Sequence, residues 1–181
     1  MTGAQDVGDH DGRVAAERLG AGALRGGLLL VVQLLADHGR RNTMGLEIEV
    51  GHHEVALGQH EIDFRFADAL RTADSVLTLK YTVKAIAARN GLIASCMPNP
   101  IIGINGSGMH CHQSLFDLEG NNLFFDADDA MNLSPLAHYF IAGQLEHARA
   151  LAGIVAPSIN SYKRLVPGYE APVYVGWAQT N

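Results

Sequence analysis

The sequence has few cysteines, fewer basic than acidic residues, and no apolar run long enough to cross a bilayer. Cys96 and Cys111 are too few for a disulfide framework, and their apolar settings predict buried thiols in a reducing cytoplasm. The 13 Lys and Arg residues face 19 Asp and Glu residues, and the net charge of −6 argues against a nucleic-acid binder held by phosphate contacts. The apolar run at 25–36 is too short for a membrane span and lacks a signal-peptide cleavage site. We therefore expect no nucleic-acid partner and no membrane attachment.

A glycine-rich stretch at 105–108 leads into a segment in which polar side chains alternate. Successive side chains of a strand point to opposite faces, so a strand here would place His110, His112 and Ser114 on one face. Two imidazoles and a hydroxyl are suited to binding a metal ion or a phosphate. The opposite, core-facing side would hold Met109, Cys111, Gln113 and Leu115. The segment therefore predicts a strand that lines a binding site.

Carboxylates and histidines also gather between residues 49 and 61. Glu54 and Glu61 lie seven residues apart, and Gly58 allows the chain to bend between them. Carboxylates on either side of a turn can converge on a hard divalent cation such as Mg²⁺ or Mn²⁺, which often also binds substrate phosphates. The residue types alone leave open a second interpretation, in which these are solvated or structural pairs.

A third polar stretch, at 160–172, is interrupted by Pro167, Gly168 and Pro172 and is therefore predicted to be a loop. It carries Arg164, whose planar guanidinium can donate two parallel hydrogen bonds to a carboxylate. Loops of this composition often hold substrate, but a surface loop with solvated charges is the alternative.

These three stretches, in this order, resemble glutamine synthetases of the bacterial type I kind. The resemblance covers residues from about 44 to 181 and includes the ATP-region signature at 100–114. It departs from the family at Asn99, where a lysine is usual.

The resemblance implies that ATP phosphorylates the side chain of L-glutamate and that ammonia then displaces the phosphate from γ-glutamyl phosphate. The implied cofactors are ATP and Mg²⁺ or Mn²⁺, and the implied assembly is a homo-oligomer, with a dodecamer expected for a full-length member. The matching positions are Glu54 and Glu61 for one metal ion, His110 for the second, Glu49, His112 and Ser114 for ATP, Asn105, Gly106 and Arg164 for glutamate, and Glu170 for the acid that helps to deprotonate ammonium.

Parts of the family pattern are not found in these 181 residues. The family has an arginine-rich strand after the position of Asn181 and a Glu-x-Glu metal pair well upstream of Glu54, and the spacing at Glu47 and Glu49 is not that pair. We therefore expect the isolated chain to be inactive. Two alternatives remain open: a glutamate–amine or polyamine ligase of the same superfamily, and a non-catalytic nucleotide-binding fragment.

The predicted elements mix strands and helices. Ile62, Phe64 and Phe66 alternate with Asp63 and Arg65, which predicts a half-buried strand at 61–66 with the three apolar residues on its buried side. A helix follows at 68–90, with Asp68 as its cap and Gly91 at its end. Its apolar residues predict a broad buried stripe that includes Leu70, Val76, Leu77, Tyr81, Val83 and Ala87. A strand at about 92–97, a hairpin turn at 121–122 and a helix from Ser134 to about residue 155 complete the pattern.

The expected fold class is α+β. We expect an antiparallel curved sheet, a half-barrel, that is backed by helices and incomplete at its C-terminal side. The predicted organisation is a non-matching leader at 1–43, poorly ordered or irregular, and a partial glutamine synthetase catalytic domain at 44–181.

Overall fold

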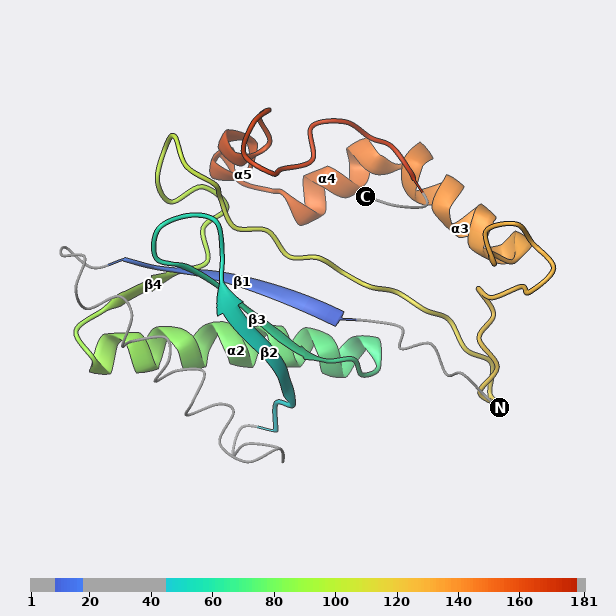
Figure 1. The fold of residues 1–181 in the computed structure, drawn as a ribbon, viewed down its shortest axis with the longest axis horizontal. Helices are drawn as coiled ribbons and strands as arrows, with labels where there is room; N and C mark the ends of the chain where they lie inside the picture. The colour runs from blue at the N-terminus through green and yellow to red at the C-terminus, as the bar shows by residue number, and fades with distance from the viewer. Residues whose placement is uncertain (1–8, 18–44, 179–181) are drawn as a thin grey trace. The chain divides into compact units, whose positions relative to one another are not determined.

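The computed structural model describes residues 9–17 and 45–178, which form two compact units (Figure 1). The first unit contains the described residues up to His112, and the second begins at Gln113. Among the described residues, the elements of the first unit are β1 (Asp9–Glu17), β2 (Ile48–His53), β3 (Gln59–Arg65), α2 (Ala69–Arg89) and β4 (Ile93–Ser95).

The sheet of the first unit has the strand order β2-β3-β1-β4, and every neighbouring pair is antiparallel. An open antiparallel sheet with helices agrees with the expected α+β class, while the half-barrel remains a prediction. β1 lies within the segment that the sequence predicts to be irregular, and it pairs with both β3 and β4. The apolar run at 25–36 falls outside the described residues, and the domain boundary near residue 43 remains a prediction.

The core of the first unit lies between the sheet and α2. Ile62 and Phe64 point to one face of β3 and are buried in one cluster with residues of the helix. The helix residues of this cluster are Leu79, Val83 and Ala87. This four-residue spacing forms a single helical stripe, so one face of α2 covers the sheet.

Three apolar residues that the sequence places in this stripe are not part of it. Leu70, Leu77 and Tyr81 are 66–75% exposed. At 100° per residue, each lies about 160–180° around the helix from Leu79, which is the buried centre of the stripe. That part of the sequence prediction was wrong because the stripe is narrower than the apolar composition of the helix suggests.

The boundaries of α2 are confirmed. The Asp68 side chain accepts a hydrogen bond from the backbone N–H of Arg71 at 2.9 Å, and Gly91 has the left-handed φ of 68° that ends many helices.

Replacing Asp68 with alanine is expected to lower the free energy of unfolding by about 1 kcal/mol, because the first turn of α2 loses its side-chain acceptor. Urea denaturation monitored by circular dichroism measures this loss. Asp74→Ala is the matched control, since Asp74 is exposed inside the same helix. An equal loss in both variants would contradict the capping role.

The described part of the second unit, residues 113–178, contains the helices α3 (Pro135–Glu146), α4 (Ala148–Val155) and α5 (Ile159–Arg164). The Ser134 cap is confirmed, because its side chain accepts a hydrogen bond from the N–H of Ala137 at 3.2 Å. The single helix predicted from Ser134 to residue 155 is instead two helices that meet at His147, which has φ −99° and ψ 12°. Nothing in the local sequence explains this break.

The predicted hairpin at 121–122 is reduced to one isolated bridge between Phe116 and Asn122. The Asp117 side chain accepts hydrogen bonds from the N–H groups of Glu119 and Asn121, and these local contacts hold the turn. Within the described ranges, no helix is both long and apolar enough to pass through a membrane.

Candidate cation and ligand site

The candidate site lies on the polar face of β3, opposite the face that packs on α2. Residues 59, 61 and 63 occupy this face because they alternate with the core residues Ile62 and Phe64. Glu61 and Asp63 are nevertheless only 3% and 5% exposed. The sequence predicts a half-buried strand, and this was wrong because both faces of β3 are covered. Phe66, predicted to be on the buried side, follows the strand and is half exposed.

A β-bulge determines which histidine of β2 reaches this face. Ile48 pairs with Phe64 and Val50 pairs with Asp63, so Glu49 is an extra residue between them. Beyond the bulge, His52 lies opposite Glu61, and His53 lies opposite His60. With regular pairing continued from Ile48 and Phe64, Gly51 would lie opposite Glu61 and His52 would lie opposite His60.

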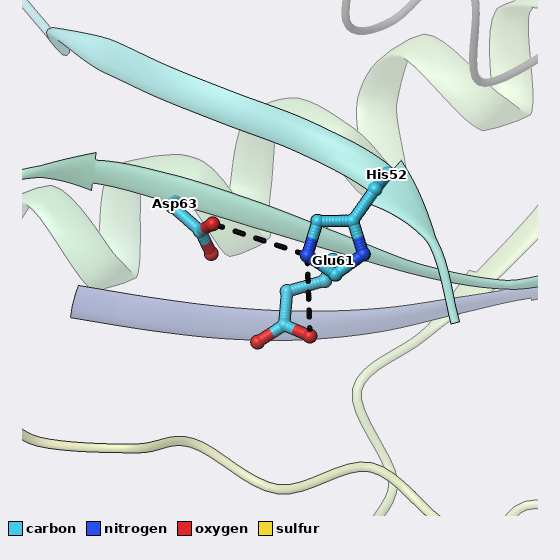
Figure 2. Close-up of side chains that lie close together, drawn as sticks. All are labelled: His52, Glu61 and Asp63. Carbon is cyan, nitrogen blue, oxygen red and sulfur yellow. Dashed lines mark ion pairs between the residues drawn. The ribbon is translucent and has the colours of Figure 1, made fainter. Parts of the chain in front are cut away.

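Three side chains of types that commonly ligate cations come together here. The Nε2 atom of His52 lies 3.8 Å from a carboxylate oxygen of Glu61 and 4.0 Å from one of Asp63, as Figure 2 shows. One donor atom from each residue lies within 4.8 Å of the other two. The two carboxylates are buried, whereas the His52 side chain is 46% exposed, so the cluster is accessible through the imidazole.

The geometry of this cluster fits a divalent cation. A cation about 2.0–2.2 Å from each donor requires donors no more than about 4.4 Å apart. Both distances from His52 meet this limit, and the Glu61 and Asp63 donor atoms lie within 4.8 Å of each other, so an adjustment of at most a few tenths of an ångström is needed. One imidazole and two carboxylates suit Mn²⁺ and similar borderline metals, and a carboxylate pair also suits Mg²⁺.

Glu61 is the predicted metal ligand that belongs to this cluster, and Glu54 and His110 are not part of it. Glu54 begins the five-residue loop between β2 and β3, where one of its carboxylate oxygens accepts a hydrogen bond from the N–H of Val55 at 3.0 Å. Gly58, with a φ of 74°, makes the bend that the sequence predicts in this loop. Glu49 is the exposed bulge residue.

The segment that carries His110, His112 and Ser114 is not a strand. It is irregular, and all three side chains are exposed. Met109, Cys111 and Leu115, predicted to face a core, are exposed as well. The alternating pattern was misleading because a strand needs a partner, and none of the described strands pairs with this segment. The buried thiol predicted at Cys111 was therefore wrong, whereas Cys96 is partly buried.

The start of the same segment is hydrogen-bonded to the first residue of β3. The side-chain amide of Gln59 donates a hydrogen bond to the carbonyl oxygen of Gly106 at 2.8 Å. The N–H of Ser107 donates to the carbonyl oxygen of Pro98 at 2.9 Å, and both Gly106 and Ser107 are buried. Asn105 beside them is half-buried. The predicted glutamate-binding positions Asn105 and Gly106 thus lie in a well-anchored part of the first unit.

His60 is a buried histidine on the core-facing side of β3. It is 1% exposed, and its ring lies 4.4 Å from that of His53. Burial, and secondly the charge of His53, lower the pKa of His60 to about 4. Neither ring nitrogen of His60 makes a hydrogen bond within the described part of the chain, so the neutral ring serves as a core residue.

The two remaining predicted positions lie in the second unit. Arg164 is half-buried and is the last residue of α5. The loop predicted at 160–172 was therefore wrong for residues 160–164, which are helical because Ser158 caps this turn with its side chain. Glu170 is exposed and has a φ of 51°, which is uncommon for a residue other than glycine. Asn132 shares this conformation with a φ of 57°, and the role of Glu170 stays a prediction.

Sequence reasoning missed His52 and Asp63. Asp63 was assigned to the solvent side of a half-buried strand, and His52 reaches Glu61 only through the bulge at Glu49. The available signals were the spacing of two between Glu61 and Asp63 and the doubled histidine at the end of the preceding strand.

Comparison with known proteins identifies the same family as the sequence motifs do. The glutamine synthetase catalytic-domain family matches residues 38–181. The glutamine synthetase of Clostridium saccharobutylicum is 58% identical over 138 residues, which cover 76% of this chain and 31% of that protein. The glutamine synthetase of Halobacterium salinarum is 56% identical over 138 residues, with 76% of this chain and 30% of that protein covered. The chain therefore spans about a third of the length of these relatives.

Solved structures of glutamine synthetase and of a protein named GmaS are also similar to this chain. The cryo-EM structure of Plasmodium falciparum glutamine synthetase has a TM-score of 0.69 and 34% identity, covering 82% of this chain and 27% of that chain. A structure described as a GmaS/ADP complex has a TM-score of 0.73 and 29% identity, covering 92% of this chain and 41% of that chain.

Proposed function

Because this chain belongs to the glutamine synthetase catalytic-domain family, we propose that it supplies part of the site at which ATP, L-glutamate and ammonia are converted to glutamine. In this reaction a carboxylate oxygen of glutamate attacks the γ-phosphorus of ATP, and ADP leaves. Ammonia then attacks the carbonyl carbon of γ-glutamyl phosphate, and phosphate leaves as the amide forms.

The observation that carries the proposal is the cluster around Glu61. A predicted metal ligand, 3% exposed, has an imidazole and a second buried carboxylate within cation-binding distance. We propose that His52 and Asp63 join Glu61 in binding one divalent cation, with Glu54 contributing from the adjacent loop, and that His110 binds a second. Bound Mg²⁺ or Mn²⁺ would neutralise charge on the phosphate oxygens.

The remaining roles belong to the chain's own side chains. Glu49, His112 and Ser114 are proposed to contact ATP, and the ADP in the GmaS complex supports an adenine nucleotide. Asn105 and Gly106 hold glutamate, and Arg164 binds its carboxylate through paired hydrogen bonds. Glu170 accepts the proton that ammonium must lose before its nitrogen can attack.

We further propose that the protein works in the cytoplasm as a homo-oligomer, with a dodecamer as the assembly of a full-length family member. The sequence has only two cysteines and so no disulfide framework, which is the usual pattern of proteins of reducing compartments.

Binding of glutamate tests this function without requiring turnover. Replacing Arg164 with glutamine is expected to weaken glutamate binding by about 2–3 kcal/mol, because the substrate carboxylate loses its charged partner. Calorimetric titration of glutamate in the presence of Mn²⁺ and ATP measures the change.

Arg149→Gln is the matched control, since Arg149 is exposed on α4 in the same unit. Equal glutamate affinity in the Arg164 and Arg149 variants would contradict the assignment of Arg164. A wild-type chain that binds neither nucleotide nor glutamate would contradict the proposed function as a whole.

A further inference from the structure

Gln59 connects two segments that the proposed function uses for different ligands. Its side-chain nitrogen donates to the carbonyl oxygen of Gly106 at 2.8 Å, across 47 residues of sequence. Its side-chain oxygen accepts from the N–H of Ala56 at 3.2 Å, in the loop that begins with Glu54. Gln59 is 2% exposed, so water does not compete effectively for either contact.

The two contacts fix the orientation of the Gln59 amide. A carbonyl can only accept a hydrogen bond and a backbone N–H can only donate one, so a reversed amide would lose both contacts. The backbone of Gln59 closes the same loop, because its N–H donates to the carbonyl of Ala56 and its carbonyl accepts from the N–H of Glu54, both at 3.0 Å. The Glu54 loop is thus held by the backbone and the side chain of one residue.

The opposite end of the connection is equally fixed. Gly106 and Ser107 are buried, and the Ser107 N–H donates to the carbonyl of Pro98. A displacement of the Glu54 loop would therefore be transmitted to the Gly106 carbonyl by the Gln59 side chain. A longer or shorter side chain could not preserve both hydrogen bonds.

We infer that Gln59 is a positioning residue that couples cation binding beside Glu54 and Glu61 to glutamate binding at Asn105 and Gly106. This inference rests on the proposed function of both segments. A cation that orders the Glu54 loop favours one position of Gln59 and so one position of the Gly106 carbonyl. Coupling of this kind is reciprocal, so glutamate strengthens cation binding by the same factor.

Two substitutions separate the contacts. Gln59→Glu keeps an acceptor for the Ala56 N–H but removes the donor to Gly106. Gln59→Met has a similar length and removes both contacts. Gln59→Asn, shorter by one methylene, replaces Gln59→Met if circular dichroism shows that the latter is unfolded. Gln144→Glu and Gln144→Met are the controls, since Gln144 is exposed on α3.

The structural connection is tested by amide hydrogen exchange in the cation-free chain. We expect Gln59→Met to accelerate exchange at the amides of Ala56 and Ser107 by about tenfold or more, because both lose protection. Gln59→Glu should accelerate exchange at Ser107 and leave Ala56 close to wild type. Unchanged exchange at Ser107 in both variants would overturn the inference.

The coupling itself is tested by titrating glutamate with and without Mn²⁺. For the wild type we expect Mn²⁺ to tighten glutamate binding by about fivefold or more, the usual lower range for coupled sites. In Gln59→Met this factor should fall below about twofold, an effect that a general loss of stability would not produce by itself. Wild-type coupling that survives in Gln59→Met would overturn this inference alone. A wild-type chain that binds neither Mn²⁺ nor glutamate would overturn the proposed function and this inference with it.

Discussion

Replacing Asp63 with asparagine is expected to remove most of the stabilisation that a divalent cation gives the first unit. A ligand at 100 times its dissociation constant raises the free energy of unfolding by about 2.7 kcal/mol. If the loss of one of two buried carboxylates weakens cation binding about a hundredfold, the same cation concentration raises the free energy of unfolding by only about 0.4 kcal/mol. The substitution keeps the shape of the side chain, so the change reports on the lost charge.

Thermal unfolding with and without excess Mn²⁺ measures this difference. Asp74→Asn is the matched control because it removes the same charge from an exposed position on α2. A second pair compares His52→Ala with His53→Ala, since only His52 contributes to the cluster. If Mn²⁺ raised the melting temperature of Asp63→Asn as much as that of the wild type, the cation would be bound elsewhere.

Lowering the pH from 6.5 to 4 is expected to cost the first unit about 3 kcal/mol of stability through His60 alone. Its pKa is about 4 in the folded chain and 6.5 as the ordinary value, so the unfolded chain takes up the proton first as the pH falls. The stability is fully present above pH 6.5 and is lost as the pH falls toward 4, with each unit of pKa difference worth about 1.4 kcal/mol.

Urea denaturation across this pH range, for the wild type and for His60→Leu, isolates the effect because other titrating groups contribute to both proteins. The leucine variant should lose less stability on acidification, while His112→Leu, at an exposed position in the same unit, should follow the wild type. Parallel pH curves for wild type and His60→Leu would show that burial of His60 does not set the acid sensitivity.

Local signals in the sequence predicted some elements well. The boundaries of α2 follow from Asp68 and Gly91, because a side-chain cap and a left-handed glycine act within one helical turn. The family could be predicted from three motifs because the order and the residue types of such motifs are specific, and the match at 38–181 confirms it.

Features that depend on contacts between residues distant in the sequence could not be predicted from local signals. The position of His52 depends on the register between β2 and β3, which the bulge at Glu49 shifts by one residue. The segment around His110 alternates like a strand, but a strand forms only where a partner is available. Burial of Asp63 likewise depends on what covers the second face of the sheet.

The position of a bound cation tests the central claim most directly. Crystals of the chain soaked in Mn²⁺ and measured near the manganese absorption edge would locate the metal by anomalous scattering. We predict a peak about 2.0–2.2 Å from Nε2 of His52 and from carboxylate oxygens of Glu61 and Asp63. A manganese peak elsewhere, with none at these three side chains, would contradict the claim.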